Sequence, residues 1–257
     1  MFKYFIKIYF LLWLCASAGQ ESAPQKPPVD SVEYKQVYGL RLGIELSKPI
    51  RTLFDDEYQG LEIMGDFRIT HKLYIAAELG NEKLTRAETL GSDINPGQFE
   101  IYDFEVSGSY LKLGVDFNTY ENWYGMNNSI FIGGRYAASA FSQTLNNYTL
   151  FDSNRYWSPD GFVEGVQPPE EFSGLNTTWL EFIFGIKAEL FANFFAGASV
   201  RLGFIVTNKE SDRMRNLWVP GFGKVTQDTK FGVGYNVSLS YLIPIYKKSK
   251  KKEDLEE

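Results

Sequence analysis

The sequence predicts an all-β protein, namely a closed antiparallel up-and-down transmembrane β-barrel of eight strands with short periplasmic turns and long extracellular loops. Three observations predict it. From residue 38 onward, apolar residues recur with a period of two, which is the period of a strand and not of a helix. After the first residues, no apolar run reaches the ~18–20 residues that a membrane helix needs. The connections between the alternating segments are short on one side and long on the other, as in bacterial outer-membrane barrels.

The first 18 residues have the pattern of a secretory signal peptide. Lys3 and Lys7 form a basic segment, and residues 8–15 form an apolar core that is too short to span a membrane. Ala16 and Ala18 supply the small residues that signal peptidase requires, so we expect cleavage after Ala18. Cleavage removes the only cysteine, and a cysteine-free exported chain is typical of a bacterial envelope protein.

Composition divides the rest of the chain into three parts. Residues 19–35 are polar and proline-rich, which indicates a flexible periplasmic linker. Residues 36–246 carry the alternation of the predicted barrel. Residues 247–257 (KKSKKKEDLEE) form a charged periplasmic tail.

Eight segments alternate apolar with small or polar residues, and each can supply the ~9–11 residues of a tilted membrane strand. A soluble β-sandwich is the alternative, but the polar face carries glycines and opposed charges in place of a solvated Thr/Lys/Ser surface. A further strand pair within residues 95–106 and 145–160 would raise the count to ten. The segments lie at residues 38–46, 61–69, 73–80, 111–118, 130–139, 180–187, 198–205 and 233–241.

The connections set the orientation. Three of them are short or moderate, and four are long. An even number of strands places both termini on the short-turn, periplasmic side. The short connections are centred on residues 70–72, 120–128 and 192–194, and the long ones span about 48–58, 86–105, 145–177 and 207–230.

With this alternation and loop asymmetry, the chain resembles the small eight-stranded bacterial outer-membrane β-barrel proteins of OmpA- and OmpX-like architecture. Among these, it is most similar to the Bacteroidota-type outer-membrane β-barrel family. The resemblance covers about residues 36–246. It implies the outer membrane of a Gram-negative bacterium, with outer-membrane lipids as the surroundings. One departure concerns the end of the barrel: Tyr246 is followed by the charged tail, so the assembly signal must be internal.

The polar face of the strands predicts an ion-pair network in the lumen. A charge on the lipid face costs ~2–4 kcal/mol at mid-membrane, so the charged face must point inward. Eight strands leave an interior that side chains just fill, which favours a salt-bridged plug over a narrow pore. The predicted network is near-balanced and comprises Arg41, Arg68, Lys112, Arg135, Lys187 and Arg201 with Glu45, Glu62, Asp66, Glu78, Asp116, Glu181 and Glu189.

Residues for catalysis are scarce. His71 is the only histidine, and it lies in a predicted periplasmic turn, where a general base cannot reach an outer-leaflet substrate. We therefore expect no enzyme activity, no catalytic residues, no cofactor and no metal. The net charge of −6 argues against nucleic acid as a partner.

The two longest loops combine aromatic residues with arginine, which is the usual composition of a binding hot spot. The alternative is that these loops pack on one another as a cap over the barrel. The candidate surface comprises Tyr156, Trp157, Phe162, Arg213, Arg215 and Trp218.

The sequence thus favours a non-enzymatic outer-membrane barrel that serves as a structural or binding platform through its extracellular loops, with an envelope protein as the expected partner. Two alternatives stay open: an accessory subunit of an outer-membrane protein assembly or surface-export complex, and a small channel.

Overall fold

The computed structural model describes residues 35–90, 99–120, 127–151, 162–164, 169–225 and 229–249. The predicted cleavage site at Ala18, the linker before residue 35 and the end of the tail lie outside these residues. All of the described residues belong to one compact unit, and the following description concerns that unit.

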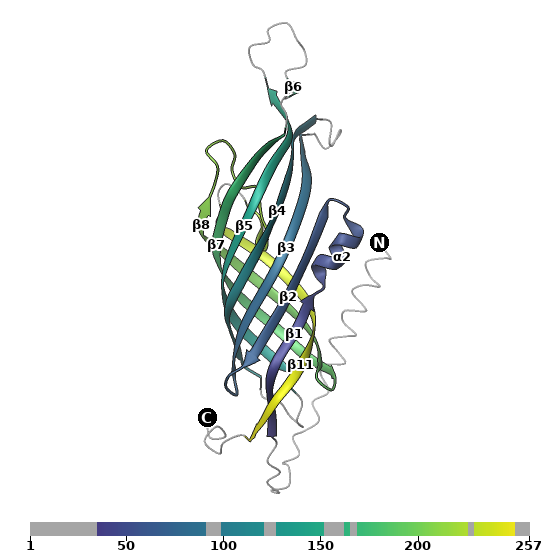
Figure 1. Cartoon of the computed structure of the whole chain (residues 1–257), viewed down its shortest axis with the longest axis vertical. Coiled ribbons are helices and arrows are strands. Elements are labelled where there is room, and N and C mark those ends of the chain that lie inside the picture. The colour runs from purple at the N-terminus through teal and green to yellow at the C-terminus, as the bar shows by residue number, and fades with distance from the viewer. Residues whose placement is uncertain are drawn as a thin grey trace, which may run out of the picture. The chain divides into compact units, whose positions relative to one another are not determined.

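Eight long strands form a closed ring (Figure 1). Each strand is antiparallel to the next along the chain, and the first strand pairs with the last, so the ring has no free end. The predicted eight-stranded closed up-and-down barrel is confirmed. The strands, in ring order, are β1 (Lys35–Glu45), β2 (Tyr58–Arg68), β3 (Leu73–Leu90), β4 (Phe99–Asn118), β5 (Ser129–Phe151), β7 (Glu170–Phe191), β8 (Phe194–Lys209) and β11 (Phe231–Ser249).

The suspected further strand pair is part of two of these eight strands. β4 and β5 stay paired from Asn118↔Phe131 up to Tyr102↔Tyr148, so residues near 102 and 148 prolong the same ladder. Three short strands lie outside the ring: β6 (Phe162–Glu164) pairs with β5, and β9 (Trp218–Val219) pairs with β10 (Gly223–Lys224).

Strands β3, β4, β5 and β7 are longer than predicted, and the loops at 86–105 and 145–177 are correspondingly shorter. We call the end of the barrel that carries the long connections its outer end. There, the strands carry polar side chains on their outward face, such as the ion pair between Lys83 and Glu105 and the hydrogen bond between Thr178 and Thr207. Apolar alternation therefore stops there, although the backbone ladder continues. The sequence signal marked the apolar part of each strand and not its end.

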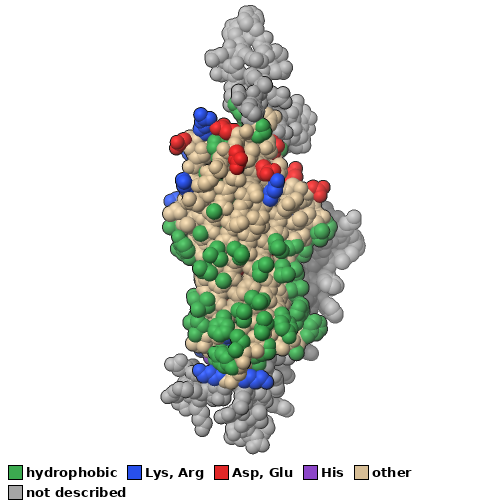
Figure 2. Space-filling model, viewed as in Figure 1, with side chains coloured by type: hydrophobic (Ala, Val, Ile, Leu, Met, Phe, Trp, Pro, Cys, Tyr) green, Lys and Arg blue, Asp and Glu red, His purple; other side chains and the backbone are tan. Residues whose placement is uncertain are grey.

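Apolar side chains cover the outside of the barrel in a broad belt. They alternate with buried residues along each strand; on β7, for example, Leu180, Phe182 and Phe184 are exposed while Glu181 and Ile183 are buried. Figure 2 shows hydrophobic side chains gathered over the middle and lower part of the barrel, with acidic and basic side chains toward its upper end. Soluble monomers rarely expose a contiguous apolar surface of this extent.

A helix interrupts the succession of strands after β1. At Glu45 the chain leaves the sheet and forms the helix α2 (Ser47–Phe54), where the sequence analysis predicted only a loop. Among the described residues, no helix is long and apolar enough to cross a membrane.

Candidate functional site

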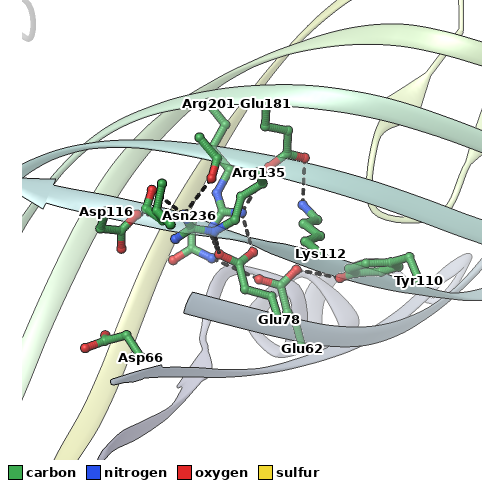
Figure 3. A network of polar contacts seen from close by, with 12 residues as sticks. Glu62, Asp66, Glu78, Tyr110, Lys112, Asp116, Arg135, Glu181, Arg201 and Asn236 are labelled. Atoms are coloured by element: carbon green, nitrogen blue, oxygen red, sulfur yellow. Dashed lines mark hydrogen bonds and ion pairs between the residues drawn. The ribbon is translucent and has the colours of Figure 1, made fainter. Parts of the chain in front are cut away.

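An unbroken chain of ion pairs crosses the lumen, and its nine members alternate in charge. Figure 3 shows the part of it that contains Asp116, Arg135, Glu78, Arg201, Glu181 and Lys112. All nine were predicted to face inward. The links, in order, are Arg41–Asp66 (3.1 Å), Asp66–Lys187 (2.7 Å), Lys187–Asp116 (3.7 Å), Asp116–Arg135 (2.7 Å), Arg135–Glu78 (3.2 Å), Glu78–Arg201, Arg201–Glu181 (3.2 Å) and Glu181–Lys112 (2.8 Å).

Seven of the eight strands contribute to this chain, because each places alternate residues inside the barrel. Two links join strands that lie opposite each other in the ring: Lys187 of β7 reaches Asp66 of β2, and Arg201 of β8 reaches Glu78 of β3. The ion pairs therefore fill the cross-section of the lumen and do not merely coat its wall.

The other four predicted residues lie inside the barrel but do not join this chain. Glu45 accepts hydrogen bonds from the backbone N–H groups of Ser47 and Lys48 at the start of α2. Arg68 donates to the carbonyl oxygens of Thr70 and His71 in the turn between β2 and β3. Glu189 accepts from the backbone N–H groups of Asn127 and Asn193, and so supports two turns at the same end; Glu62 belongs to the cluster described next.

A second polar cluster lies nearer the outer end, and its centre is Lys48 of α2. The Nζ atom of Lys48 lies 2.9 Å from Glu62 and 3.6 Å from Glu82. Tyr110 donates to Glu62 over 2.6 Å, and the backbone N–H of Gly221 donates to Glu82 over 3.1 Å. The cluster therefore ties α2 and the β9–β10 hairpin to the barrel wall.

The charge of Lys48 is stabilised by this cluster. Burial by itself lowers the pKa of Lys48, but the carboxylates of Glu62, Glu82 and Glu45 more than offset that effect, so the pKa lies above its ordinary value. Sequence reasoning missed Lys48 and Glu82. The available signal was the helical spacing of Ile50, Leu53 and Phe54, which leaves Lys48 and Arg51 on the opposite face.

Aromatic rings pack against the cations in the other half of the lumen. The guanidinium of Arg41 lies 4.6 Å from the ring centre of Phe195, that of Arg68 lies 4.8 Å from Tyr38, and the ammonium of Lys187 lies 4.7 Å from Phe131. Tyr38 is buried beside an irregularity in the ladder, where β11 carries one extra residue, Ile245, between the partners of Tyr38 and Gly39.

The predicted loop surface is only partly described. Arg213 is exposed and pairs with Glu170 over 2.8 Å, and the carbonyl of Arg215 accepts a hydrogen bond from Gln143. Trp218 lies in β9, half-buried, with Arg51 over its ring at 5.6 Å, so it is part of a cap and not of an open surface. Phe162 begins β6, and Tyr156 and Trp157 lie outside the described residues.

A hydrophobic cluster closes the outer end of the lumen. Trp179, Phe141 and Tyr110 are strand residues whose side chains are buried inside the barrel. Val219 and Phe222, from the fourth long loop (residues 207–230), pack onto them. Between this cluster and the ion pairs remains a cavity of about 220 Å³, whose walls include Lys48, Glu62, Arg201 and Phe222. The loop-cap interpretation therefore applies to the fourth loop.

The described residues show no metal centre, and the one histidine lies in a turn. His71 lies in the β2–β3 turn, with its Nδ1 atom 3.1 Å from Nη2 of Arg68. Within the described ranges, no group of three or more His, Cys, Asp or Glu residues is arranged to hold a metal ion. The carboxylates of the lumen face ammonium and guanidinium groups instead.

Comparison with known proteins gives one family and one structural likeness. No curated protein matches the chain. A crystal structure of Ail, the attachment invasion locus protein of Yersinia pestis, is similar over 80% of this chain and 98% of that one, at 8% sequence identity and a TM-score of 0.37. A family model described as "Domain of unknown function (DUF6048)" matches residues 1–248, and the chain therefore belongs to the DUF6048 family.

Proposed function

We propose that this protein is a non-enzymatic outer-membrane β-barrel that serves as a rigid platform for binding through its outer end. The observation that carries the proposal is the combination of an apolar outer belt with a lumen that is filled by ion pairs. An apolar exterior on strands that close into a ring is what a hydrocarbon environment requires of a strand protein.

The filled lumen argues against the channel alternative. Ion pairs join opposite walls, and the hydrophobic cluster around Trp179 lies above them. A conducting path would have to separate buried charges from their partners, at a cost of ~3–5 kcal/mol for each broken pair.

The outer end supports the platform role. Strands β3, β4, β5 and β7 extend beyond the apolar belt, and the ion pair between Lys83 and Glu105 together with the buried Phe104 and Phe172 makes this extension a packed structure. A rigid outer end reduces the entropy that a partner must remove on binding. Surface loops then carry the specificity, as is common on rigid scaffolds.

Two measurements test the proposal. The purified chain should insert into lipid vesicles, and the folded protein should then run on gels as a heat-modifiable band. Planar bilayers that contain it should show no conductance above background. Deletion of residues 152–168, which spares β7, should leave the heat-modifiable band intact but abolish an envelope or surface phenotype of the wild-type protein. Stable single-channel currents, or a deletion without any phenotype, would contradict the platform role.

A further inference from the structure

The wall of the barrel lacks one strand in its outer half. β1 ends at Glu45, opposite Ser238 of β11, and the chain then turns away into α2. β11 extends seven residues further, to Phe231, and stays paired with β8 on one side as far as Phe231↔Phe204. In the part of the chain that the structure describes, no strand pairs with the other side of β11 over residues 231–237.

Two hydrogen bonds show which backbone groups face this open side. The carbonyl of Val237 accepts from the N–H of Leu46, on the β1 side, over 2.7 Å. The carbonyl of Lys230 accepts from the N–H of Ile205, on the β8 side, over 2.9 Å. Because peptide groups alternate between the two edges of a strand, Val233 and Tyr235 direct both N–H and C=O toward the open side.

The side chains of the same stretch are unusually exposed. Val233 and Tyr235 are 76% and 74% exposed, whereas Leu202, on the paired neighbour β8, is 51% exposed. All three belong to the apolar belt. The larger exposed fraction of Val233 and Tyr235 is expected where a strand lacks a neighbour on one side. Unpaired backbone groups within such a belt carry a high desolvation cost, so this edge requires a partner.

Helix α2 does not supply that partner, because it packs on β2. The Thr52 hydroxyl accepts a hydrogen bond from the N–H of Gly60 over 3.0 Å, and the guanidinium of Arg51 lies 3.9 Å from the ring centre of Tyr58. The cavity of about 220 Å³ is lined by Lys48 of α2 and by Gly234 of β11. We call the space along the open edge of β11, beside this cavity, the slot.

We propose that this slot docks an extended strand of another membrane-embedded β-barrel protein, which pairs antiparallel with β11 along residues 231–237. Such a strand would continue the ladder that β1 already forms with β11 up to Glu45. Its outward residues would be apolar, to match Val233 and Tyr235, and its inward residues would be polar, to enter the charged cavity. The edge has neither the charge nor the proline that normally prevents such pairing.

A second copy of this chain does not fit the slot. Two β11 edges can pair antiparallel, with their apolar faces on the same side, only about a twofold axis perpendicular to the sheet. That axis lies in the membrane plane, so it would invert one barrel relative to the other. The partner is therefore a different protein, and this conclusion rests on the proposed membrane location.

Backbone amide exchange tests the edge directly. The probe is a synthetic nine-residue peptide that copies residues 38–46, the natural neighbour of β11, added to the full chain folded in detergent micelles. Without peptide, the amides of Val233 and Tyr235 should exchange fast, while those of Gly232 and Gly234, which face β8, should be protected. With peptide, the amides of Val233 and Tyr235 should become protected at least about tenfold.

Proline variants supply the second test. Val233→Pro removes an N–H that faces the slot, and proline is tolerated at such an edge position, so the variant should stay folded and heat-modifiable. It should weaken peptide binding about tenfold or more, whereas Val233→Thr, which keeps the N–H, should bind like the wild type. Gly234→Pro should instead break the β8 ladder and destabilise the barrel.

Two outcomes would overturn the proposal. One is protection of Val233 and Tyr235 in the micelle or in a lipid nanodisc without peptide, which would mean that the chain itself or lipid satisfies the edge. The other is equal peptide binding by the wild type and Val233→Pro. Both readouts are obtained on folded protein in detergent or nanodiscs, so they are independent of the loop phenotype that tests the platform role.

Discussion

Arg201 and Glu78 join opposite walls of the barrel. They lie on β8 and β3, which are four strands apart in either direction around the ring, and Nη2 of Arg201 lies 3.2 Å from Oε1 of Glu78. Both side chains are buried. The lumen is therefore braced across its width, in addition to the hydrogen bonds that run around its wall.

This brace should behave as a coupled pair. Arg201→Met leaves Glu78 and Glu181 with one fewer cation each, and it should lower the free energy of unfolding by ~3–5 kcal/mol. Adding Glu78→Gln should recover part of that loss, because the uncompensated charge is removed. Urea unfolding in lipid vesicles, followed by tryptophan fluorescence, measures Arg201→Met, Glu78→Gln and the double variant. A double variant whose loss equals the sum of the two single losses would show that the residues are not coupled.

An ion pair buried in the lumen should contribute more to stability than an ion pair on the surface. Arg135→Ala breaks contacts with Asp116 and Glu78 inside the lumen and should be strongly destabilising. Arg213→Ala breaks an exposed contact with Glu170 and should cost only ~0–1 kcal/mol. The temperature at which the folded band disappears on a heat-modifiability gel compares them. Equal melting of both variants would contradict a structural role for the lumen network.

One glycine makes room for a ring. A Cβ atom on Gly80 would collide with the ring of Tyr110, whereas a Cβ on Gly134 would meet its nearest neighbour, the carbonyl oxygen of Glu181, only at 4.0 Å. Gly80→Ala should therefore destabilise the barrel by ~1–3 kcal/mol. Gly134→Ala should be tolerated and serves as the matched control. The same unfolding assay decides, and a neutral Gly80→Ala would mean that Tyr110 is free to move.

The contact of Lys48 with its carboxylates predicts a pH dependence. Since folding raises the pKa of Lys48 above its ordinary value of 10.5, the stabilisation is complete below that value and declines as the pH rises further. Lys48→Met should therefore be less stable than the wild type at neutral pH, and the difference should shrink above a pH of about 10.5. Thermal unfolding of both proteins at several alkaline pH values measures it. A constant difference would rule out the charge of Lys48 as the cause.

The alternation of the strands predicted the barrel and the inward position of the charges, because a membrane wall has two faces of opposite chemistry. Arg135 and Glu181, for example, could be placed inside from the apolar residues on either side of them. Which cation meets which carboxylate could not be predicted. Pairing across the lumen depends on the register and tilt of strands that are distant in the sequence, such as β3 and β8.

Other features lacked a sequence signal of the right kind. The ring of Tyr38 is buried beside Arg68, next to a ladder irregularity that the sequence does not mark. The outer ends of β4 and β5 are held by backbone pairing with polar side chains outside, which reads as a loop. Trp218 was predicted in a loop surface, but it packs beneath Arg51 because the hydrophobic cluster needs a lid.

The pairing of β1 with β11 has a consequence for biogenesis. Lys35 lies opposite Ser249, so the ring cannot close until the strand that ends at Ser249 is in place. Before closure, the β2–β3 hairpin carries Asp66 and Glu78 without Lys187 and Arg201, their partners from the later strands. A hairpin inserted alone would bring bare carboxylates into lipid. For the membrane location proposed above, we therefore expect insertion to be one cooperative event that begins only when the last strand is available.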